Sequence, residues 1–586
     1  MLLRGKQITP RAPGRAAIVI IALALALRIG LTLAGWPPTN SDESTMGIMA
    51  IHIIHGKDFP IFLYGQLYMG ALEAYIAAGL MHVGETLFAL RLANMLLFTL
   101  ALTSFYLLAS LLYTKKVALI TIALLSIGSV MMIFTELMAH GGYPEIISLG
   151  VTSFLLAAYL ALTSNQQTPL YRQWKRLLAY FGWGLASALG FWGDYIMLPI
   201  ILMTGLLILL FCWRELLKGA ILPVLLGLLI GGIPLILYNL SSPPTTSTLA
   251  VIWSLRNNFT PELTHSVYYQ FRYFYEAKGT LLVSLPMATG APPLCFDSGW
   301  VVYGRGGGFA AFQCLNPQAP TGLIALSLIW SAGFLVLWLL STTHELAALW
   351  RLRRFAAKSP ALRQEVIRHF ARLALLLCAA LILLEFTLSP VSAVFSAAAR
   401  YLTGLLIATP VIIAPLCGYA RDRSVLQSLV ANNPDSSPPR RSLFVPFSAV
   451  LRWGGLLFIA VVLLAGTFSI FSELPTVRAV DGQQQALITD LTSIHVTHFY
   501  TDYWTCNRLA FLSDERLICA VLDSNLNETH TRPPGYYAIV KGDPRSAYMF
   551  PLGSVEADKV ARLFAQSKQP YRRSIFEGYV VYQPLK

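Results

Sequence analysis

The chain has 586 residues, of which 56% are hydrophobic and only 12% are charged, and its mean hydropathy is +0.60. So much apolar surface exceeds what the interior of a soluble protein can bury, so the composition excludes an ordinary soluble protein and predicts a polytopic membrane protein. The formal net charge of +14 does not indicate nucleic-acid binding, because the basic residues lie between apolar segments, as in the cytoplasmic loops of membrane proteins.

Apolar segments near the roughly 20 residues that a helix needs to cross a bilayer recur along the chain. We expect about eleven membrane spans, joined by loops of contrasting charge. The expected spans are 16–35, 87–112, 117–135, 145–163, 176–192, 195–213, 219–239, 321–341, 370–388, 401–420 and 447–470.

The distribution of basic residues sets the expected orientation. If the N-terminus is cytoplasmic, alternate connections should be rich in Lys and Arg, and every one of them is. These connections hold Lys115, Lys116, Arg172, Lys175, Arg176, Arg214, Lys218, Arg351, Arg353, Arg354, Lys358, Arg363, Arg368, Arg421, Arg423, Arg440 and Arg441. We therefore expect a multi-pass protein of the plasma (inner) membrane, with its N-terminus inside, a transmembrane domain at 1–470 and an extracytoplasmic domain at 471–586.

The first outer loop, residues 36–86, is unusual because it concentrates acidic residues in a chain that has few. Its carboxylates are Asp42, Glu43, Asp58, Glu73 and Glu85, against a single Lys. Ser41 is expected to cap a helix that carries two of these acids in its first turn. The segment 67–83 is nearly long enough to span, but a span there would invert every later loop, so we expect two interfacial helices in this loop.

The other outer segments are a loop at about 240–320 and the terminal domain. The terminal domain should be a small α/β unit, with helices at 486–491 and 555–566 and strands near 495–500, 517–522, 536–540 and 579–582. Two cysteine pairs fall on the outer side, Cys295 with Cys314 and Cys506 with Cys519, and both fit disulfides in an oxidising compartment.

Asp42 and Glu43 are the first candidates for chemistry. Adjacent acids in the first turn of a helix also favour the helix dipole, so a purely structural role stays open. A carboxylate at the membrane surface can instead deprotonate an acceptor hydroxyl, or hold a cation that steadies a phosphate leaving group. Glu73 lies in an apolar run, where an acid is costly unless it is paired or used.

Four further positions can carry binding or capping roles. Glu145 follows Pro144 at a helix start, so capping and function are equally open. Asp194 is most simply the N-cap of the next helix. Arg400, followed by Tyr401, lies at the outer mouth of the tenth span, against the usual charge trend, and its planar fork suits a lipid phosphate.

A metal site finds little support in the sequence. His52 and His55 lie one helical turn apart, but no third ligand is in register with them. No CxxC spacing occurs either.

Several short motifs together carry a resemblance to a known family. They are Ser41-Asp42-Glu43 after the first apolar span, Tyr64-Gly65-Gln66 and Gly70-Ala71-Leu72-Glu73, the later Arg400-Tyr401, and a terminal outer domain with Thr501-Asp502-Tyr503-Trp504. In this layout the chain resembles the bacterial branch of the protein mannosyltransferase and aminoarabinose transferase superfamily, the polyprenyl-phosphate-sugar-dependent glycosyltransferases of the class C fold.

The resemblance implies an inverting transfer of a hexose or pentose from a polyprenyl-phosphate donor to a glycan, lipid or protein acceptor of the cell envelope. It implies that Asp42 is the catalytic base, with Glu43 beside it in support, and that Arg400 holds the lipid phosphate. The resemblance supplies no counterpart for Glu73 and Glu145, which remain candidates for orienting the acceptor or a cation, and Tyr401 is a further candidate for substrate binding. The family is divided on metal use, so the metal is left unknown and a divalent cation stays open.

The alternative is a multi-span transporter or flippase of lipid-linked sugars. Such a protein would also have many spans and intramembrane acids. It usually shows internal repeats with paired broken helices, and the two halves of this chain show no such symmetry.

Overall fold

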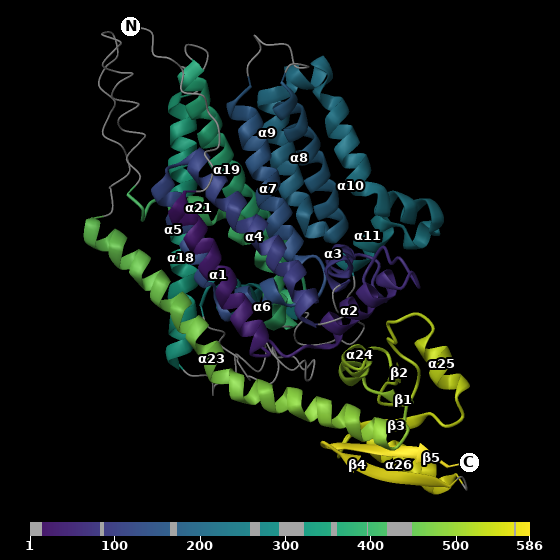
Figure 1. The fold of residues 1–586 in the computed structure, drawn as a ribbon. Coiled ribbons are helices and arrows are strands. Elements are labelled where there is room, and N and C mark those ends of the chain that lie inside the picture. Colours follow the sequence, from purple (N-terminus) through teal and green to yellow (C-terminus); the bar gives the residue numbers. More distant parts are fainter. Residues whose placement is uncertain are drawn as a thin grey trace, which may run out of the picture.

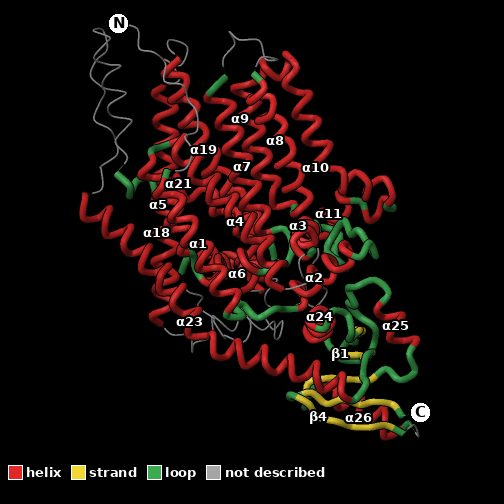
Figure 2. The backbone as a smooth tube through the Cα atoms, viewed as in Figure 1, coloured by secondary structure: helices red, strands yellow, loops and turns green. Residues whose placement is uncertain are grey.

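Long apolar helices form a bundle, to which a small C-terminal sheet domain is attached (Figure 1). The computed structural model describes residues 14–82, 87–164, 173–257, 270–291, 321–352, 360–394, 396–418, 448–567 and 570–585. Figure 2 shows that strands occur at one end of the molecule, beyond the ends of the bundle helices. The prediction of a polytopic helical protein with a C-terminal α/β domain is confirmed.

The bundle begins with α1 and ends with the long α23, and α7 lies inside it, packed against α4, α8, α9 and α19. Its principal helices are α1 (Arg15–Leu33), α4 (Leu87–Leu112), α5 (Lys115–Ile127), α6 (Val130–Leu137), α7 (Tyr143–Leu162), α8 (Trp174–Gly193), α9 (Leu198–Glu215), α10 (Ile221–Ser241), α18 (Thr321–Leu352), α19 (Pro360–Thr387) and α23 (Ala449–Ser493).

Shorter helices connect or cover these. They are α2 (Ser41–Ile54), α3 (Leu72–Met81), η2 (Tyr195–Met197), η3 (Leu216–Ala220), η4 (Pro244–Thr246), α11 (Thr248–Asn257), α14 (Arg272–Gly279), η5 (Thr280–Ser284), α15 (Leu285–Thr289), α20 (Val391–Val394), η6 (Ser396–Ala408) and α21 (Thr409–Ile412). The two helices expected in the first loop are therefore present, as α2 and α3.

Among the described residues, seven helical stretches are long and apolar enough to cross a membrane, or eight if the bent pair α5 and α6 is one span. One stretch, Tyr195–Ser241, contains a turn at Gly219, where φ is 107°. This turn separates α9 from α10, close to where the sequence predicted two spans. The expected span at 401–420 falls instead on the short η6 and α21, so the count of eleven is not confirmed.

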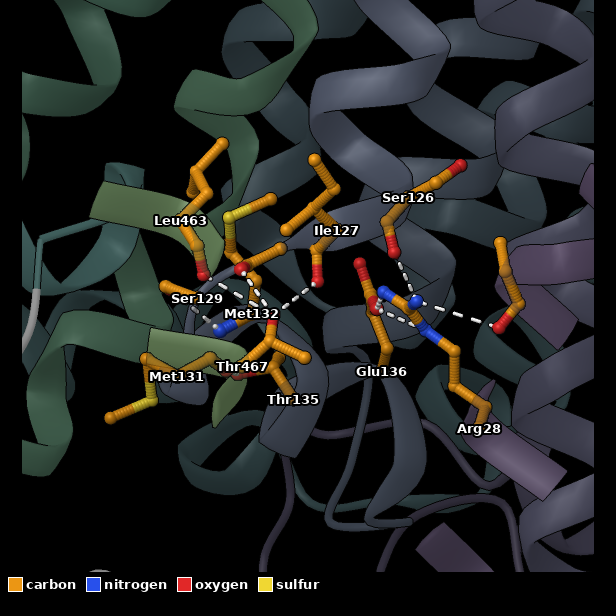
Figure 3. Close-up of polar contacts among 12 residues, drawn as sticks. Arg28, Ser126, Ile127, Ser129, Met131, Met132, Thr135, Glu136, Leu463 and Thr467 are labelled. Carbon is orange, nitrogen blue, oxygen red and sulfur yellow. Dashed lines mark hydrogen bonds and ion pairs between the residues drawn. The ribbon is translucent and has the colours of Figure 1, made fainter. Parts of the chain in front are cut away.

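The bend between α5 and α6 is held by side chains from distant helices (Figure 3). The two helices meet at 82°. Arg28 of α1 is fully buried there, donates to Glu136 Oε2 at 2.6 Å and also bonds the carbonyl of Ser126. Thr467 of α23 donates to the carbonyl of Ile127 at 3.1 Å. Because an unpaired buried charge would be costly, this arrangement fixes the direction in which α6 leaves the bend.

The terminal domain contains a five-stranded sheet in the order β2-β1-β3-β5-β4, in which β1 is parallel to β2 and β3 and the other pairs are antiparallel. A disulfide between Cys506 and Cys519, one of the two pairs that fit disulfides in the sequence, joins α24 to β2. Cys295 and Cys314 lie outside the described residues. The elements are β1 (His498–Thr501), α24 (Tyr503–Leu512), β2 (Ile518–Val521), α25 (Tyr536–Gly542), β3 (Ala547–Pro551), α26 (Val555–Gln566), β4 (Tyr571–Phe576) and β5 (Tyr579–Pro584).

Most elements of this domain match the prediction, and one was wrong. The segment 536–540 forms the helix α25 rather than a strand. Gly535, with φ 81°, starts that helix from a left-handed position, which redirects the chain away from the sheet. The strands β3 and β4 were not predicted.

Candidate functional site

The helix α2 lies at the end of the bundle that meets the terminal domain (Figure 1), and its first turn carries Asp42 and Glu43. The cap is Asn40, whose side chain accepts from the Glu43 backbone N–H at 2.9 Å, so the prediction of Ser41 as the cap was wrong by one residue. Asn40 is the last extended residue before the helix, which is the position a cap requires. The Ser41 hydroxyl instead donates to the carbonyl of Tyr503 at 2.8 Å.

Asp42 is held by two donors from the terminal domain. The Tyr503 hydroxyl donates to Asp42 Oδ1 at 2.5 Å, and Arg532 Nη2 donates to the same oxygen at 3.1 Å. Arg532 Nη1 also donates to the carbonyl of Tyr64 at 3.1 Å, and its guanidinium lies 5.2 Å from the centre of the Tyr503 ring. The Asp42 side chain keeps 15% of its surface exposed.

Opposing influences act on the charge of Asp42. Burial raises its pKa, but the charges of Arg532 and Arg400, the Tyr503 hydrogen bond and His140 together hold the pKa below its ordinary value. The carboxylate is therefore ionised at neutral pH, in the form that can accept a proton.

Glu43 has a different environment. Arg91 of α4 binds it through two parallel hydrogen bonds, Nε to Oε1 at 2.9 Å and Nη2 to Oε2 at 2.8 Å. Both side chains are fully buried. Because both carboxylate oxygens are occupied, Glu43 acts as an internal anchor between α2 and α4.

Close approach of three backbone segments creates the next part of the site. Gly70 N donates to the carbonyl of Gly193 at 2.9 Å. Gly142 packs on the same carbonyl, and a Cβ on Gly142 would lie 2.6 Å from the Gly193 oxygen. Gly142 also has φ 78°, which an L side chain rarely adopts. The glycines thus allow the first loop, the start of α7 and the end of α8 to meet.

This meeting point gathers three buried carboxyl groups, Glu73, Glu145 and Asp194. Glu73 accepts from Gly141 N at 3.2 Å, while its other oxygen and both oxygens of Glu145 have no hydrogen-bond donor among the described residues. Burial and the neighbouring Glu145 raise the pKa of Glu73 well above its usual range. We infer that the two carboxyls share a proton, as closely spaced buried carboxyls do.

Asp194 is the predicted cap, because its Oδ1 accepts from Ile196 N at 2.9 Å. Its Oδ2 is buried and has no hydrogen-bond partner among the described residues. Burial raises the pKa of Asp194 to about 7.

Arg400 and Tyr401 lie on η6 beside the start of α7. The Arg400 guanidinium is 5.5 Å from the ring centres of both Tyr143 and Tyr401, and these two rings are 5.7 Å apart. Arg400 Nε and the Tyr143 hydroxyl are buried and lack hydrogen-bond partners in the described part of the chain. The ring of His140 lies 5.0 Å from that of Tyr143, and burial together with Arg400 lowers the pKa of His140 to about 3, so His140 is neutral.

Comparisons with known proteins give a fold assignment. No protein-family model and no curated protein matches the chain. The crystal structure of ArnT from Cupriavidus metallidurans bound to undecaprenyl phosphate is similar over 97% of both chains, with 12% identity and a TM-score of 0.54. Its apo state gives a TM-score of 0.52 at the same identity and coverage.

The chain has the fold of ArnT. The predicted class C glycosyltransferase-like architecture is confirmed at the level of the fold. The archaeal oligosaccharyltransferase AglB from Archaeoglobus fulgidus also matches, with 11% identity over 97% of this chain and 74% of that chain, at a TM-score of 0.41.

Within this ArnT-like fold, the residues singled out in the sequence separate into two groups. One group surrounds a common region next to the terminal domain, and electrostatic or ring contacts connect its neighbouring members. Glu43 alone forms the second group, because its side chain is buried in the bundle and paired with Arg91 of α4. The first group consists of Asp42, Glu73, Glu145, Asp194, Arg400 and Tyr401, and the structure adds His140 to it.

Sequence reasoning missed Arg532 and Arg91. Arg532 is 490 residues from Asp42 in sequence, and Arg91 is 48 residues from Glu43. Arg91 carried a usable signal, since an Arg within an otherwise apolar span needs a partner. Arg532 carried none, because it is one of several basic residues in a polar domain.

A second cluster joins the first loop to the terminal domain, around Glu515. Its Oε1 lies 2.8 Å from His52 Nε2, and Lys57 donates to its Oε2 at 2.8 Å. His52 Nδ1 lies 2.8 Å from the Tyr64 hydroxyl, which donates to Asp58. Asp58, one of the five acids of the first outer loop, therefore belongs to a hydrogen-bond network.

The described residues contain no group of three or more His, Cys, Asp or Glu side chains arranged to hold a metal ion. His52 is taken up by Glu515 and Tyr64, and the His55 Nδ1 lies 3.0 Å from the carbonyl of Ile51.

Proposed function

We propose that the protein is an integral membrane glycosyltransferase that takes a sugar from a polyprenyl-phosphate donor. It passes the sugar to a glycan, lipid or protein of the cell envelope, on the outer face of the plasma (inner) membrane. In this orientation the N-terminus is cytoplasmic and the terminal domain extracytoplasmic, since the basic connections then lie inside. The ArnT structure with bound undecaprenyl phosphate supports a donor of this class for a chain of the same fold.

The observation that carries the proposal is an ionised, partly exposed carboxylate, Asp42, within the electrostatic reach of Arg400. A base and a phosphate-binding cation at one site are what a displacement at a sugar phosphate requires. Buried polar atoms without partners, at Arg400, Tyr143, Glu145 and Asp194, offer hydrogen bonds to a polar substrate.

In the reaction, Asp42 accepts the proton of the acceptor hydroxyl as its oxygen attacks the anomeric carbon. The bond between that carbon and the phosphate oxygen breaks, and the polyprenyl phosphate leaves with the bonding electrons. Arg400 stabilises the negative charge that develops on the phosphate. Attack opposite the leaving group inverts the anomeric configuration. Glu145, with its shared proton, and Tyr401 orient the hydroxyl groups of the sugar.

The test uses the purified full-length protein in liposomes with a set of radiolabelled polyprenyl-phosphate sugars, and with envelope extract as acceptor. We expect transfer of one sugar class to extract, and loss of roughly 10²–10⁴ of the turnover in Asp42→Asn, as for other general bases. Asp558→Asn is the matched control, because Asp558 is exposed in the first turn of α26.

Mass spectrometry of envelope glycans from cells with and without the gene identifies the sugar and the acceptor. Turnover of the wild-type level in Asp42→Asn would rule out Asp42 as the base. Movement of the lipid-linked sugar across the bilayer without transfer would overturn the glycosyltransferase assignment in favour of a flippase.

A further inference from the structure

The two hydrogen bonds to Asp42 use only one of its oxygens. Tyr503 and Arg532 both donate to Oδ1. Oδ2 makes no hydrogen bond to a described residue and is not among the buried atoms that lack a partner. One oxygen is thus saturated by the terminal domain, while the other stays accessible with its lone pairs free.

Both donors are fixed to the same strand of the terminal domain. Tyr503 begins α24, which the disulfide between Cys506 and Cys519 ties to β2. The Thr531 hydroxyl, next to Arg532 in the chain, accepts from Val521 N of β2 at 2.9 Å. The two donors therefore reach Asp42 from a rigid base.

Arg532 also bridges two parts of the first loop. Its planar fork joins Asp42 to the carbonyl of Tyr64 and lies over the ring of Tyr503. A guanidinium bound at three sides has little rotational freedom, so it constrains the rotation of the Asp42 carboxylate. Lysine, with one point charge, cannot make all of these contacts.

We propose that Arg532 and Tyr503 are positioning residues of the glycosyl transfer, which saturate Asp42 Oδ1 and so aim Oδ2 at the acceptor hydroxyl. The proposal rests on the function proposed above and assigns part of the active site to the terminal domain. Arg532 and Tyr503 act through Asp42 and do not themselves touch the reacting atoms.

The pH dependence of the reaction reports this arrangement. The groups that act on Asp42 are Arg532, Tyr503, Arg400 and His140. Of the charged groups on the packed helices α3 and α4, Glu73 faces Glu145 and Arg91 is bound by Glu43. Arg532 lowers the pKa of Asp42, so its removal raises that pKa. The low-pH limb of the turnover profile then moves to higher pH.

The experiment measures kcat, KM for the donor and the pH profile of full-length variants in liposomes. We expect Arg532→Gln to lower kcat by about 10²-fold and Tyr503→Phe by about 10-fold, because a misaligned reactive group loses rate on this scale. KM for the donor should change little, since the donor phosphate is bound at Arg400. Arg532→Lys should restore the pH profile but only part of kcat.

Matched controls distinguish the positioning of the Asp42 carboxylate from the general packing of the terminal domain against the bundle. Arg545→Gln removes the same charge from an exposed position of the same domain, and Tyr536→Phe removes a hydroxyl that bonds Glu515. Both should keep the wild-type profile. Full kcat and an unshifted profile in Arg532→Gln and Tyr503→Phe would overturn the proposal, as would the same shift in Tyr536→Phe. If Asp42→Asn is inactive in that case, the proposed function survives without this inference.

Discussion

The neighbouring acids Asp42 and Glu43 have the same sequence signal and opposite surroundings. Successive residues on a helix point about 100° apart, so Asp42 faces the terminal domain while Glu43 faces α4. Asp42 keeps an accessible oxygen, whereas both oxygens of Glu43 are bound to the buried Arg91. One acid is available for proton transfer, and the other holds in place the helix that carries it.

The difference teaches that the role proposed for each carboxylate depends on its partner and not on its position in the loop. Arg532 reaches Asp42 from the terminal domain, while Arg91 reaches Glu43 from within the bundle. Substitutions around Asp42 should therefore change turnover, and those around Glu43 should change stability.

The largest effect on stability is expected from Glu43→Ala. This variant leaves Arg91 charged, buried and without its carboxylate, which costs about 3–5 kcal/mol in comparable buried pairs. The measurement is the Tm of the purified protein in detergent, together with the yield of folded protein. An unchanged Tm would contradict the structural role of the pair.

The double variant Glu43→Leu with Arg91→Met is the control. Replacing both partners of a buried ion pair by apolar residues is often nearly neutral, so folding should recover. Turnover should recover with it, since Asp42 is retained. A folded but inactive double variant would show that Glu43 takes part in the chemistry.

Arg400→Ala tests the other side of the Asp42 site. Removing the cation should weaken binding of polyprenyl phosphate by about 2–5 kcal/mol, as expected when one partner of a buried charge pair is lost. Affinity is measured by competition with a fluorescent polyprenyl phosphate. Arg545→Ala, at an exposed position, should bind normally. Equal affinity in both variants would contradict the proposal that Arg400 binds the phosphate.

Much of the fold could be predicted because the physical signals are local. Apolar runs and basic loops predicted a multi-span protein, and the periodicity at 555–566 predicted α26 with its observed bounds. The count of spans was harder to predict, since the short helices η6 and α21 lie where hydropathy alone suggests one continuous helix. The strand expected at 536–540 was wrong because a turn at Gly535 starts a helix there.

The candidate site was predictable only in part, because residues that meet in it are far apart along the chain. Asp42, Arg400 and Glu145 stand out individually, as charges next to apolar segments. Their partners do not, because a pair such as Asp42 and Arg532 joins residues 490 positions apart in the chain. Glu43 shows the converse, since the sequence cannot tell a buried anchor from a catalytic acid.

Gly142→Ala should damage the site while leaving the Glu43 anchor intact. The new Cβ would lie 2.6 Å from the Gly193 oxygen, at a φ of 78°, so we expect a cost of about 2–4 kcal/mol from overlap and strain. The start of α7 must shift, and Glu145 moves away from Glu73. Turnover and Tm are both measured. Gly542→Ala, where the added Cβ meets no atom within 4 Å, is the control.

The smallest effect should come from Glu515, which links the terminal domain to the first loop. Asp42 depends on that domain for its two donors, whereas Glu43 does not. Burial raises the pKa of Glu515, but hydrogen bonds from His52, Lys57 and Tyr536 lower it from 4.5 to about 2. Because the folded pKa is depressed, its stabilisation is complete above pH 4.5 and is lost as the pH falls towards 2. At pH 6, Glu515→Gln should lower the free energy of unfolding by about 1–2 kcal/mol. This figure is kept small because Lys57 is half exposed, so solvent screens its charge. The Tm difference between wild type and variant should shrink between pH 5 and pH 3, and a constant difference would show that the charge of Glu515 does not hold the domain.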